Sequence, residues 1–252
     1  MSIEKLNIKK LPSKPGPNEI HIYPVDFNKG IEYLKKFETL LNEEEKNKAA
    51  RFHFRKDRNA FILAHGILRS ILANYLDTNP GQIEFQFNEY GKPFLRGNDI
   101  LNFNISHSKE KLLLAFSTNI LLGIDVEFMN TDFANGDIAE KFFSPAEVSM
   151  LNKLPGNLKT EGFYNCWTRK EALIKGIGKG LSIPLDSFDV ELTPGKTPKI
   201  FDLRFDKQEK GKWEIIDLDL FADYKSAIAI KSNTFNIKLF NIEKYCVFLT
   251  YS

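Results

Sequence analysis

Two carboxylates lie two residues apart in a short apolar segment, Gly123-Ile124-Asp125-Val126-Glu127. The alternation predicts a strand with Asp125 and Glu127 on one face, their Cα atoms about 6.6 Å apart. Two charges about 5 Å apart repel by roughly 3 kcal/mol at an effective dielectric constant of about 20, so a sheltered pair requires a cation. Mg²⁺ fits, because it prefers oxygen ligands and also accepts phosphate. The alternative is a solvated outer face of an edge strand.

A second charged segment, Trp167 to Lys175, has helical spacing. Glu171 and Lys175 lie one turn apart, in the order that favours an ion pair. A surface ion pair beside a core tryptophan is the alternative interpretation. The glycine-rich run 176–180 follows this helix, whereas phosphate-binding glycine loops precede theirs, so the run predicts a helix end and a tight turn.

Groups that suit a phosphate monoester lie in Tyr90-Gly91-Lys92-Pro93 and in Asn104-Ile105-Ser106-His107-Ser108. They offer hydroxyl, imidazole and ammonium donors, and a glycine that lets the backbone approach closely. A Ser–His nucleophile pair is the rival, but adjacent strand residues point to opposite faces, so Ser106 cannot easily reach His107. A structural role is the other alternative for His107. The four histidines lack the spacing of a zinc site.

The elements that must position these groups follow from periodicity. Apolar residues recur every three or four positions over 43–76, which predicts two helices or a bent one. A capping box at Ser144 predicts a short helix, and a second helix is expected from Gly162 to Lys175. We expect strands near 83–87, 112–116, 121–126, 188–192, 213–216 and 227–230, and residues 103–108 as a strand that runs into a polar loop. The order predicts two α+β halves that meet near residue 120, with a cleft between them.

Composition limits the class of protein. The 252 residues are 42% hydrophobic with 22 Phe, enough for a core, and a net charge of +2 gives no reason to expect nucleic acid or membrane as a partner. The apolar runs are far shorter than the ~18 residues of a membrane span, and we find no secretory signal, so we expect a cytoplasmic protein. Cys166 and Cys246 match no paired motif, and we expect both to be reduced.

Taken together and in chain order, the four segments resemble the 4′-phosphopantetheinyl transferase superfamily, specifically its long, monomeric, surfactin-synthetase-type branch. The resemblance covers residues 20–240. It implies an α+β fold of two similar α/β subdomains in a pseudo-twofold arrangement, with the active site in the cleft between them. Residues 1–119 would contact the adenosine and 3′-phosphate of coenzyme A, and residues 120–252 would carry the metal-binding and catalytic groups. The expected partners are coenzyme A and an apo acyl or peptidyl carrier protein.

The resemblance also implies catalytic roles. Asp125, Glu127 and Glu171 would surround Mg²⁺, which also holds the pyrophosphate of coenzyme A. Lys175 would lie against that pyrophosphate and assist the departing 3′,5′-ADP. Glu171 would be the base for the carrier serine, with a metal-bound water as the open alternative. Displacement at phosphorus needs positioning and charge neutralisation, which these groups supply.

The remaining implied contacts concern coenzyme A. The 3′-phosphate would be held by Ser106, His107 and Lys92, with Tyr90-Gly91 near the adenine. Lys48 matches a basic residue that touches phosphate in family members. The chain departs from the family pattern in the same region, at Glu45, Ala60 and His65.

Two other functions fit the sequence less well. A coenzyme A or nucleotide-binding module without turnover would not need Asp125, Glu127, Glu171 and Lys175 together. A nucleic-acid-binding module could use the basic residues between Lys46 and Arg58, but the neighbouring Glu43-Glu44-Glu45 would repel phosphates.

Overall fold

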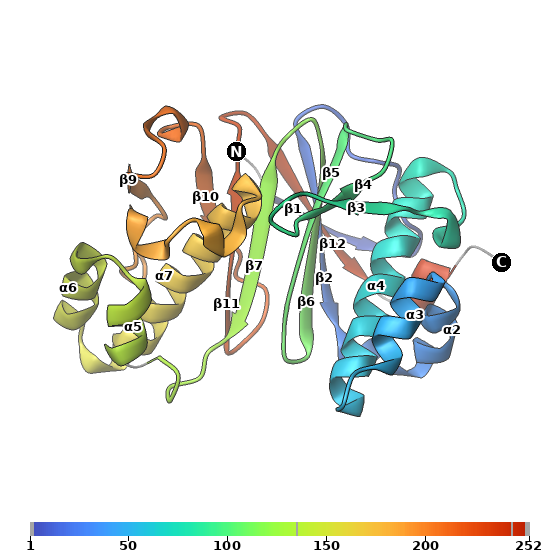
Figure 1. Cartoon of the computed structure of the whole chain (residues 1–252), viewed down its shortest axis with the longest axis horizontal. Helices are drawn as coiled ribbons and strands as arrows, with labels where there is room; N and C mark the ends of the chain where they lie inside the picture. Colours follow the sequence, from blue (N-terminus) through green and yellow to red (C-terminus); the bar gives the residue numbers. More distant parts are fainter. Residues whose placement is uncertain (1–2, 135, 243, 250–252) are drawn as a thin grey trace.

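The computed structural model describes residues 3–134, 136–242 and 244–249, and in it two sheets pack face to face between two long helices (Figure 1). The larger sheet has the order β1-β12-β2-β6-β5 (Ile3–Ile8, Asn236–Ile242, Glu19–Asp26, Lys111–Thr118 and Leu101–Ser108). The smaller sheet has the order β10-β11-β7 (Glu214–Asp217, Tyr224–Ile230 and Leu122–Phe128). Helix α4 (Arg55–Leu76) covers the outer face of the larger sheet, and α7 (Gly156–Ile177) covers that of the smaller. The α+β prediction is confirmed.

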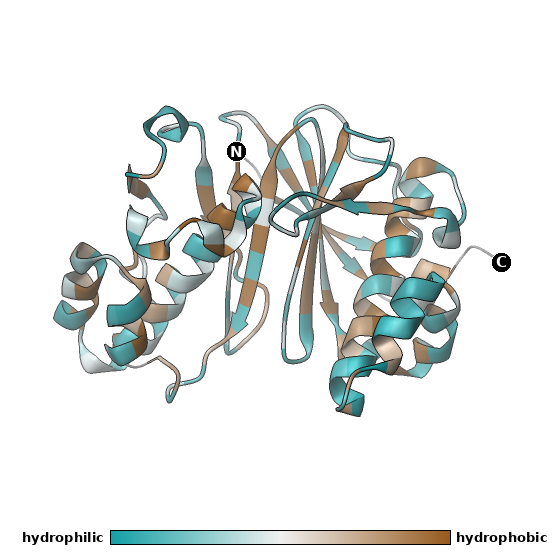
Figure 2. Ribbon diagram, in the orientation of Figure 1, coloured by the Kyte–Doolittle hydropathy of each residue, from teal (hydrophilic) through white to brown (hydrophobic). Residues whose placement is uncertain are grey.

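The alternation of side chains along the strands explains these layers. In β7, Ile124 and Val126 are fully buried in the core between the sheets, so Asp125 points the other way, toward α7. In β6, Leu113 belongs to this central core, whereas Leu114 packs in the core beneath α4. Hydrophobic residues accordingly lie along the central strands and on the inner helix faces (Figure 2). Burial of both faces of these strands gives each half a helix-on-sheet core.

Shorter elements complete the two halves. The first half adds α1 (Phe27–Gly30), α2 (Leu34–Thr39), α3 (Glu43–Ala50) and the hairpin β3–β4 (Phe85–Phe87 and Pro93–Leu95). The second adds α5 (Gly136–Phe142), α6 (Pro145–Lys153) and the hairpin β8–β9 (Phe188–Val190 and Ile200–Leu203). The two helices predicted over 43–76 are confirmed, as is the capping box at Ser144. Helix α7 begins at Gly156, earlier than predicted, directly after Pro155.

The end of the chain returns to the first half. Strand β12 pairs in parallel with both β1 and β2, so it lies inside the larger sheet. The division of the chain between residues 119 and 120 stays a prediction. Strand β12 crosses that division, because it follows residue 120 in the chain but lies in the sheet of the first half. Cys166 is a buried free thiol, while the side chain of Cys246 lies outside the described residues. No helix in the described part of the chain is long and apolar enough to cross a membrane.

A buried histidine in the larger sheet makes stability depend on pH. His21 is 2% exposed, and its Nδ1 lies 2.7 Å from the Tyr75 hydroxyl. Burial lowers the pKa of His21 from 6.5 to about 4. The unfolded state therefore binds more protons between these values, so stability is full above pH 6.5 and falls by about 3 kcal/mol as the pH drops toward 4. Urea unfolding across this range should show a smaller loss for His21→Phe than for the wild type; equal losses would contradict the assignment.

Candidate active site

Strand β7 and helix α7 are in direct backbone contact at two glycines. A Cβ atom on Gly123 would lie 2.2 Å from the Ala172 carbonyl oxygen and 2.2 Å from the Gly176 nitrogen. A Cβ atom on Gly176 would lie 2.6 Å from the Trp213 ring. Only glycine permits so close an approach. The helix ends at Gly178, whose φ of 84° is left-handed, as the glycine run predicted; Gly176 lies inside the helix and serves the contact instead.

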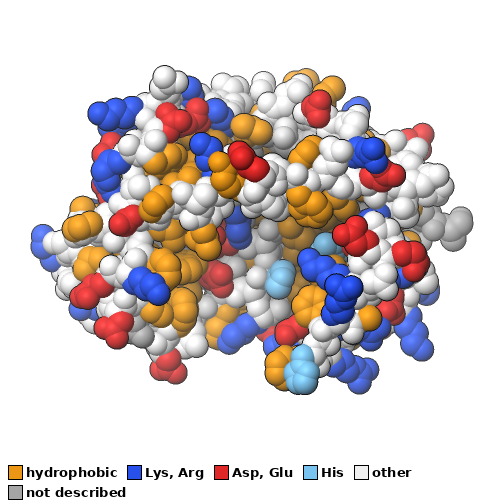
Figure 3. All heavy atoms as spheres, in the orientation of Figure 1, with side chains coloured by type: hydrophobic (Ala, Val, Ile, Leu, Met, Phe, Trp, Pro, Cys, Tyr) orange, Lys and Arg blue, Asp and Glu red, His pale blue; other side chains and the backbone are white. Residues whose placement is uncertain are grey.

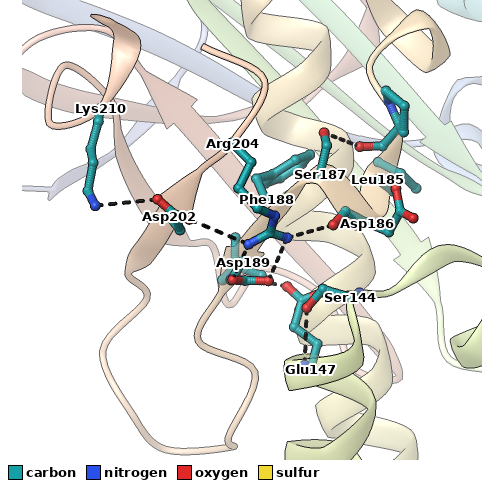
Figure 4. Close-up of polar contacts among 12 residues, drawn as sticks. Ser144, Glu147, Leu185, Asp186, Ser187, Phe188, Asp189, Asp202, Arg204 and Lys210 are labelled. Atoms are coloured by element: carbon teal, nitrogen blue, oxygen red, sulfur yellow. Dashed lines mark hydrogen bonds and ion pairs between the residues drawn. The ribbon is translucent and has the colours of Figure 1, made fainter. Parts of the chain in front are cut away.

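Ion pairs made by two buried basic side chains of α7 fix the rotation of the helix. Arg169 Nε donates to Asp217 on β10 (2.9 Å). Lys170 Nζ lies 2.8 Å from a Glu147 carboxylate oxygen, and both side chains are 0% exposed. Glu147 also caps α6 at Ser144 and accepts from the Val190 N–H in β8. In Figure 4, Glu147 and Ser144 lie beside the β8 strand, where Arg204 pairs with Asp189. Helix α7 is therefore tied to three neighbouring elements.

Asp125 is the most buried carboxylate at the contact of β7 with α7. The residue is 1% exposed, and its Oδ1 accepts from Lys175 Nζ (2.6 Å) and from Ser106 Oγ (2.8 Å). Its Oδ2 is also buried and, among the described residues, has no hydrogen-bond partner. A buried carboxylate oxygen without a partner costs free energy, and a cation would relieve that cost.

Two further carboxyls share this environment. Burial and the charge of Asp125 raise the pKa of Glu127 to about 7, and the same two causes raise the pKa of Glu171 to about 6. Burial disfavours the Lys175 ammonium, but Asp125, Glu171 and Glu127 outweigh it and raise the pKa of Lys175. Three carboxyls and one ammonium therefore interact across the contact of β7 with α7, and their catalytic and metal-binding roles stay predictions.

The donor set fits a hard divalent cation. Carboxylate oxygens are the ligands that Mg²⁺ prefers, and Asp125 Oδ2 lacks a partner. Across residues 3–134, 136–242 and 244–249, no three Asp, Glu, His or Cys side chains are arranged to hold a metal ion in this conformation. The Lys175 ammonium instead supplies the positive charge beside Asp125. The Mg²⁺ ligand set stays a prediction, and these side chains would have to move to bind the ion together.

Three side chains of β5 take the place of a backbone ladder between β5 and β7. Their oxygens accept from backbone N–H groups of β7: Asn104 from Ile124, Ser106 from Val126, and Ser108 from Phe128. The Ser106 and Ser108 hydroxyls also donate to Asp125 and Glu127. The strand predicted over 103–108 is confirmed, and its polar end remains extended because β5 pairs with β6 as far as Ser108. Sequence reasoning missed the roles of Asn104 and Ser108, although their spacing of two was the available signal.

His107 points away from Ser106, as strand alternation predicted. Ser106 is buried against Asp125, whereas His107 is exposed and its ring centroid lies 6.2 Å from that of Phe27. Within the described residues, Lys92, Ser106 and His107 make no hydrogen bond or ion pair with one another. Lys48 lies over the Phe61 ring, with its Nζ 5.4 Å from the centroid. Figure 3 shows a hollow between the halves where acidic, basic and histidine side chains gather.

The departure at Glu45 has a structural reason. The Glu45 side chain completes the capping box that begins α3 at Asn42. It also pairs with Arg69 Nε (2.6 Å), which is fully buried, and with His65 Nδ1 (2.9 Å). An acidic residue is required here because the Arg69 charge is out of contact with water. The acid at 45 and the histidine at 65 thus belong to one ion-pair network.

The turn that contains Tyr90, Gly91 and Lys92 reaches the second half. Gly91 has a φ of 83°, and Tyr90 is 43% exposed. Lys92 Nζ donates to the carbonyl oxygens of Gly176 (3.0 Å) and Leu122 (3.5 Å). A cavity of about 230 Å³ lies beside this turn, lined by Lys92, the end of α7 and the start of β5. The phosphate and adenine contacts implied for this segment stay predictions.

Comparisons with known proteins match both halves. A family model described as "4′-phosphopantetheinyl transferase superfamily" matches residues 121–229, and one described as "4′-phosphopantetheinyl transferase, N-terminal" matches residues 31–119. The 4′-phosphopantetheinyl transferase HetI of Nostoc sp. is 31% identical over 227 residues, which are 87% of this chain and 92% of HetI. The transferase gsp of Aneurinibacillus migulanus is 30% identical, covering 90% and 88%. The transferase Sfp of Bacillus subtilis is 36% identical, covering 63% and 69%.

Proposed function

This chain belongs to the 4′-phosphopantetheinyl transferase superfamily, and we propose that it transfers the 4′-phosphopantetheine group of coenzyme A to a serine of an apo acyl or peptidyl carrier protein. The carrier serine oxygen bonds to phosphorus, the bond to 3′,5′-ADP breaks, and the serine proton passes to a base. The observation that carries the proposal is the meeting of Asp125 and Glu127 of β7 with Glu171 and Lys175 of α7 where these two elements pack together, with Lys175 Nζ 2.6 Å from Asp125 Oδ1.

The acidic residues and Lys175 divide the work. Asp125, Glu127 and Glu171 would hold Mg²⁺, which when bound neutralises charge on the pyrophosphate of coenzyme A. Lys175 keeps an ammonium in the site, where it balances the negative charge that the leaving group gains. Glu171 accepts the serine proton, and its pKa of about 6 lies close to the value that suits a base at neutral pH. A metal-bound water remains the alternative base.

The first half would bind the nucleotide end of coenzyme A. His107 and Lys48 offer donors to the 3′-phosphate from the exposed side of β5 and from α3. The adenine would lie near Tyr90-Gly91, in the turn whose Asn88 and Lys92 line the cavity of about 230 Å³. The Ser106 hydroxyl donates to Asp125, so Ser106 would have to give up this hydrogen bond before it could donate to the phosphate.

The direct test is transfer to apo carriers. The purified chain, coenzyme A and Mg²⁺ are incubated with several apo acyl and peptidyl carriers, and the intact mass of each carrier is measured. We expect one or more carriers to gain a phosphopantetheine group, and a chelator to prevent the gain. Coenzyme A binding without a mass change on any carrier would instead favour a binding module without turnover. The quaternary state, expected to be monomeric, is read from the same sample by light scattering.

His107 gives a prediction specific to the 3′-phosphate. His107→Ala should raise KM for coenzyme A by about 10-fold, because one hydrogen bond to a charged group is lost. With dephospho-coenzyme A, which lacks that phosphate, the variant and wild type should have equal KM. His53→Ala, which removes an exposed histidine beside Phe54, is the control and should match wild type with both substrates. An equal rise in KM with both substrates would place His107 elsewhere in the site.

A further inference from the structure

The turn at residues 88–92, in the first half, is hydrogen-bonded to the end of α7, in the second half. Asn88 Nδ2 donates to the Gly178 carbonyl oxygen (2.6 Å), and Lys92 Nζ donates to that of Gly176 (3.0 Å). Lys92 Nζ also lies 3.5 Å from the carbonyl oxygen of Leu122, where β7 begins. A single ammonium thus touches the end of the helix that carries Lys175 and the start of the strand that carries Asp125.

The physical chemistry of a helix end favours this contact. The last carbonyl groups of a helix have no partner within it, and they carry partial negative charge. A lysine ammonium satisfies both conditions, because it supplies donors and positive charge. Lys92 is largely buried there, which lowers its pKa to about 8. A charged side chain kept away from water must have partners, and the carbonyl groups of Gly176 and Leu122 serve as partners here.

The shape of the turn and of the helix end match. Asn88 Oδ1 accepts from the N–H groups of Tyr90 and Lys92, which closes the turn and aims the Lys92 side chain. On the other side, a Cβ atom on Gly178 would lie 3.1 Å from Lys92 Cδ and 3.5 Å from Asn88 Nδ2. The turn therefore contacts bare backbone, and no side chain of α7 separates them.

We propose that Lys92, supported by Asn88, is a positioning residue that holds the end of α7 against the start of β7 and so fixes Lys175 beside Asp125. Only the expected effect on kcat rests on the proposed transfer function; the structural role of Lys92 does not. Lys175 immediately precedes Gly176, so movement of that carbonyl group moves the ammonium directly. The role differs from that of a phosphate ligand, because it acts whether or not the substrate has a 3′-phosphate.

Lys92→Met keeps most of the side-chain volume and removes the donors. With an apo carrier, kcat should fall by up to about 100-fold, because small displacements of catalytic groups have effects of this size. The factor should be the same with coenzyme A and with dephospho-coenzyme A, and KM should change little. A loss confined to coenzyme A would make Lys92 a 3′-phosphate ligand and overturn the proposal, as would an unchanged kcat.

Amide hydrogen exchange tests the same contact without turnover. Exchange at residues 174–178 should be faster in Lys92→Met than in the wild type, with no change in the first turns of α7. Unchanged protection would overturn the proposal even if activity falls. This arm needs no carrier, so failure of the transfer assay and failure of the positioning role can be told apart.

A second variant, Asn88→Asp, tests the same contact in case Lys92→Met folds poorly. Asn88→Asp keeps the acceptor for the turn but places an acceptor against the Gly178 carbonyl group, so it should lower kcat and protection in the same direction. Asn74→Ala is the control, because it also removes a side-chain bond to a carbonyl oxygen, that of Pro12, far from α7 in the chain. Its kcat should equal that of the wild type; a matching fall in Asn74→Ala would reduce the Lys92 effect to general destabilisation.

Discussion

Asp125→Asn is expected to lower kcat/KM for transfer by roughly a thousand-fold, the effect of removing one preorganised charge from a transition state. The amide keeps the size of the side chain and removes the charge that Lys175 pairs with at 2.6 Å. It also places an NH₂ or a neutral oxygen where the carboxylate has a buried Oδ2 with no hydrogen-bond partner among the described residues. Initial rates of holo-carrier formation, followed by mass, give the comparison.

Binding of Mg²⁺ supplies a second measurement for Asp125. A ligand that binds only the folded state stabilises it, so Mg²⁺ should raise the melting temperature of the wild type and raise that of Asp125→Asn much less. Asp219→Asn, a change at an exposed acidic residue of the second half, is the control and should match wild type in both assays. Wild-type activity in Asp125→Asn would contradict the assignment of Asp125 as a metal ligand.

Gly123→Ala is expected to lower kcat by about 100-fold through displacement of α7. The added methyl group would start 2.2 Å from the Ala172 carbonyl oxygen and the Gly176 nitrogen, and neither backbone atom can rotate away. Helix α7 must therefore shift from β7, which carries Glu171 and Lys175 away from Asp125. Overpacking of this kind also destabilises a fold by about 1–3 kcal/mol, which urea unfolding would measure.

Gly81→Ala separates the contact from the general effect of adding a methyl group. No atom lies within 4 Å of a Cβ built at Gly81, so this variant should keep wild-type kcat and stability. If Gly123→Ala is destabilised yet retains its kcat per folded molecule, the spacing of β7 and α7 does not control the chemistry.

Local sequence patterns were sufficient to predict on which face of its strand or helix each acidic residue lies. Alternation along a strand put Asp125 and Glu127 opposite the apolar Ile124 and Val126, and the structure buries those two between the sheets. The i,i+4 spacing put Glu171 and Lys175 on one helix face. The division into two helix-and-sheet halves followed from the order of the same patterns. The direction of a side chain within its own element depends on backbone periodicity, which the sequence reports directly.

Only the tertiary structure decided which elements face one another. No local pattern indicates that β12 enters the sheet between β1 and β2, or that Ser106 meets Asp125. Lys92 donates to backbone carbonyl groups, and that of Gly176 is more than 80 positions away in the chain. Every residue has a carbonyl group, so the sequence does not indicate which one is the partner. The sequence therefore predicted which groups carry the chemistry, and it determined the face of the strand or helix on which each lies. Long-range packing, set by close contacts such as Gly123 against Gly176, determined how those faces meet.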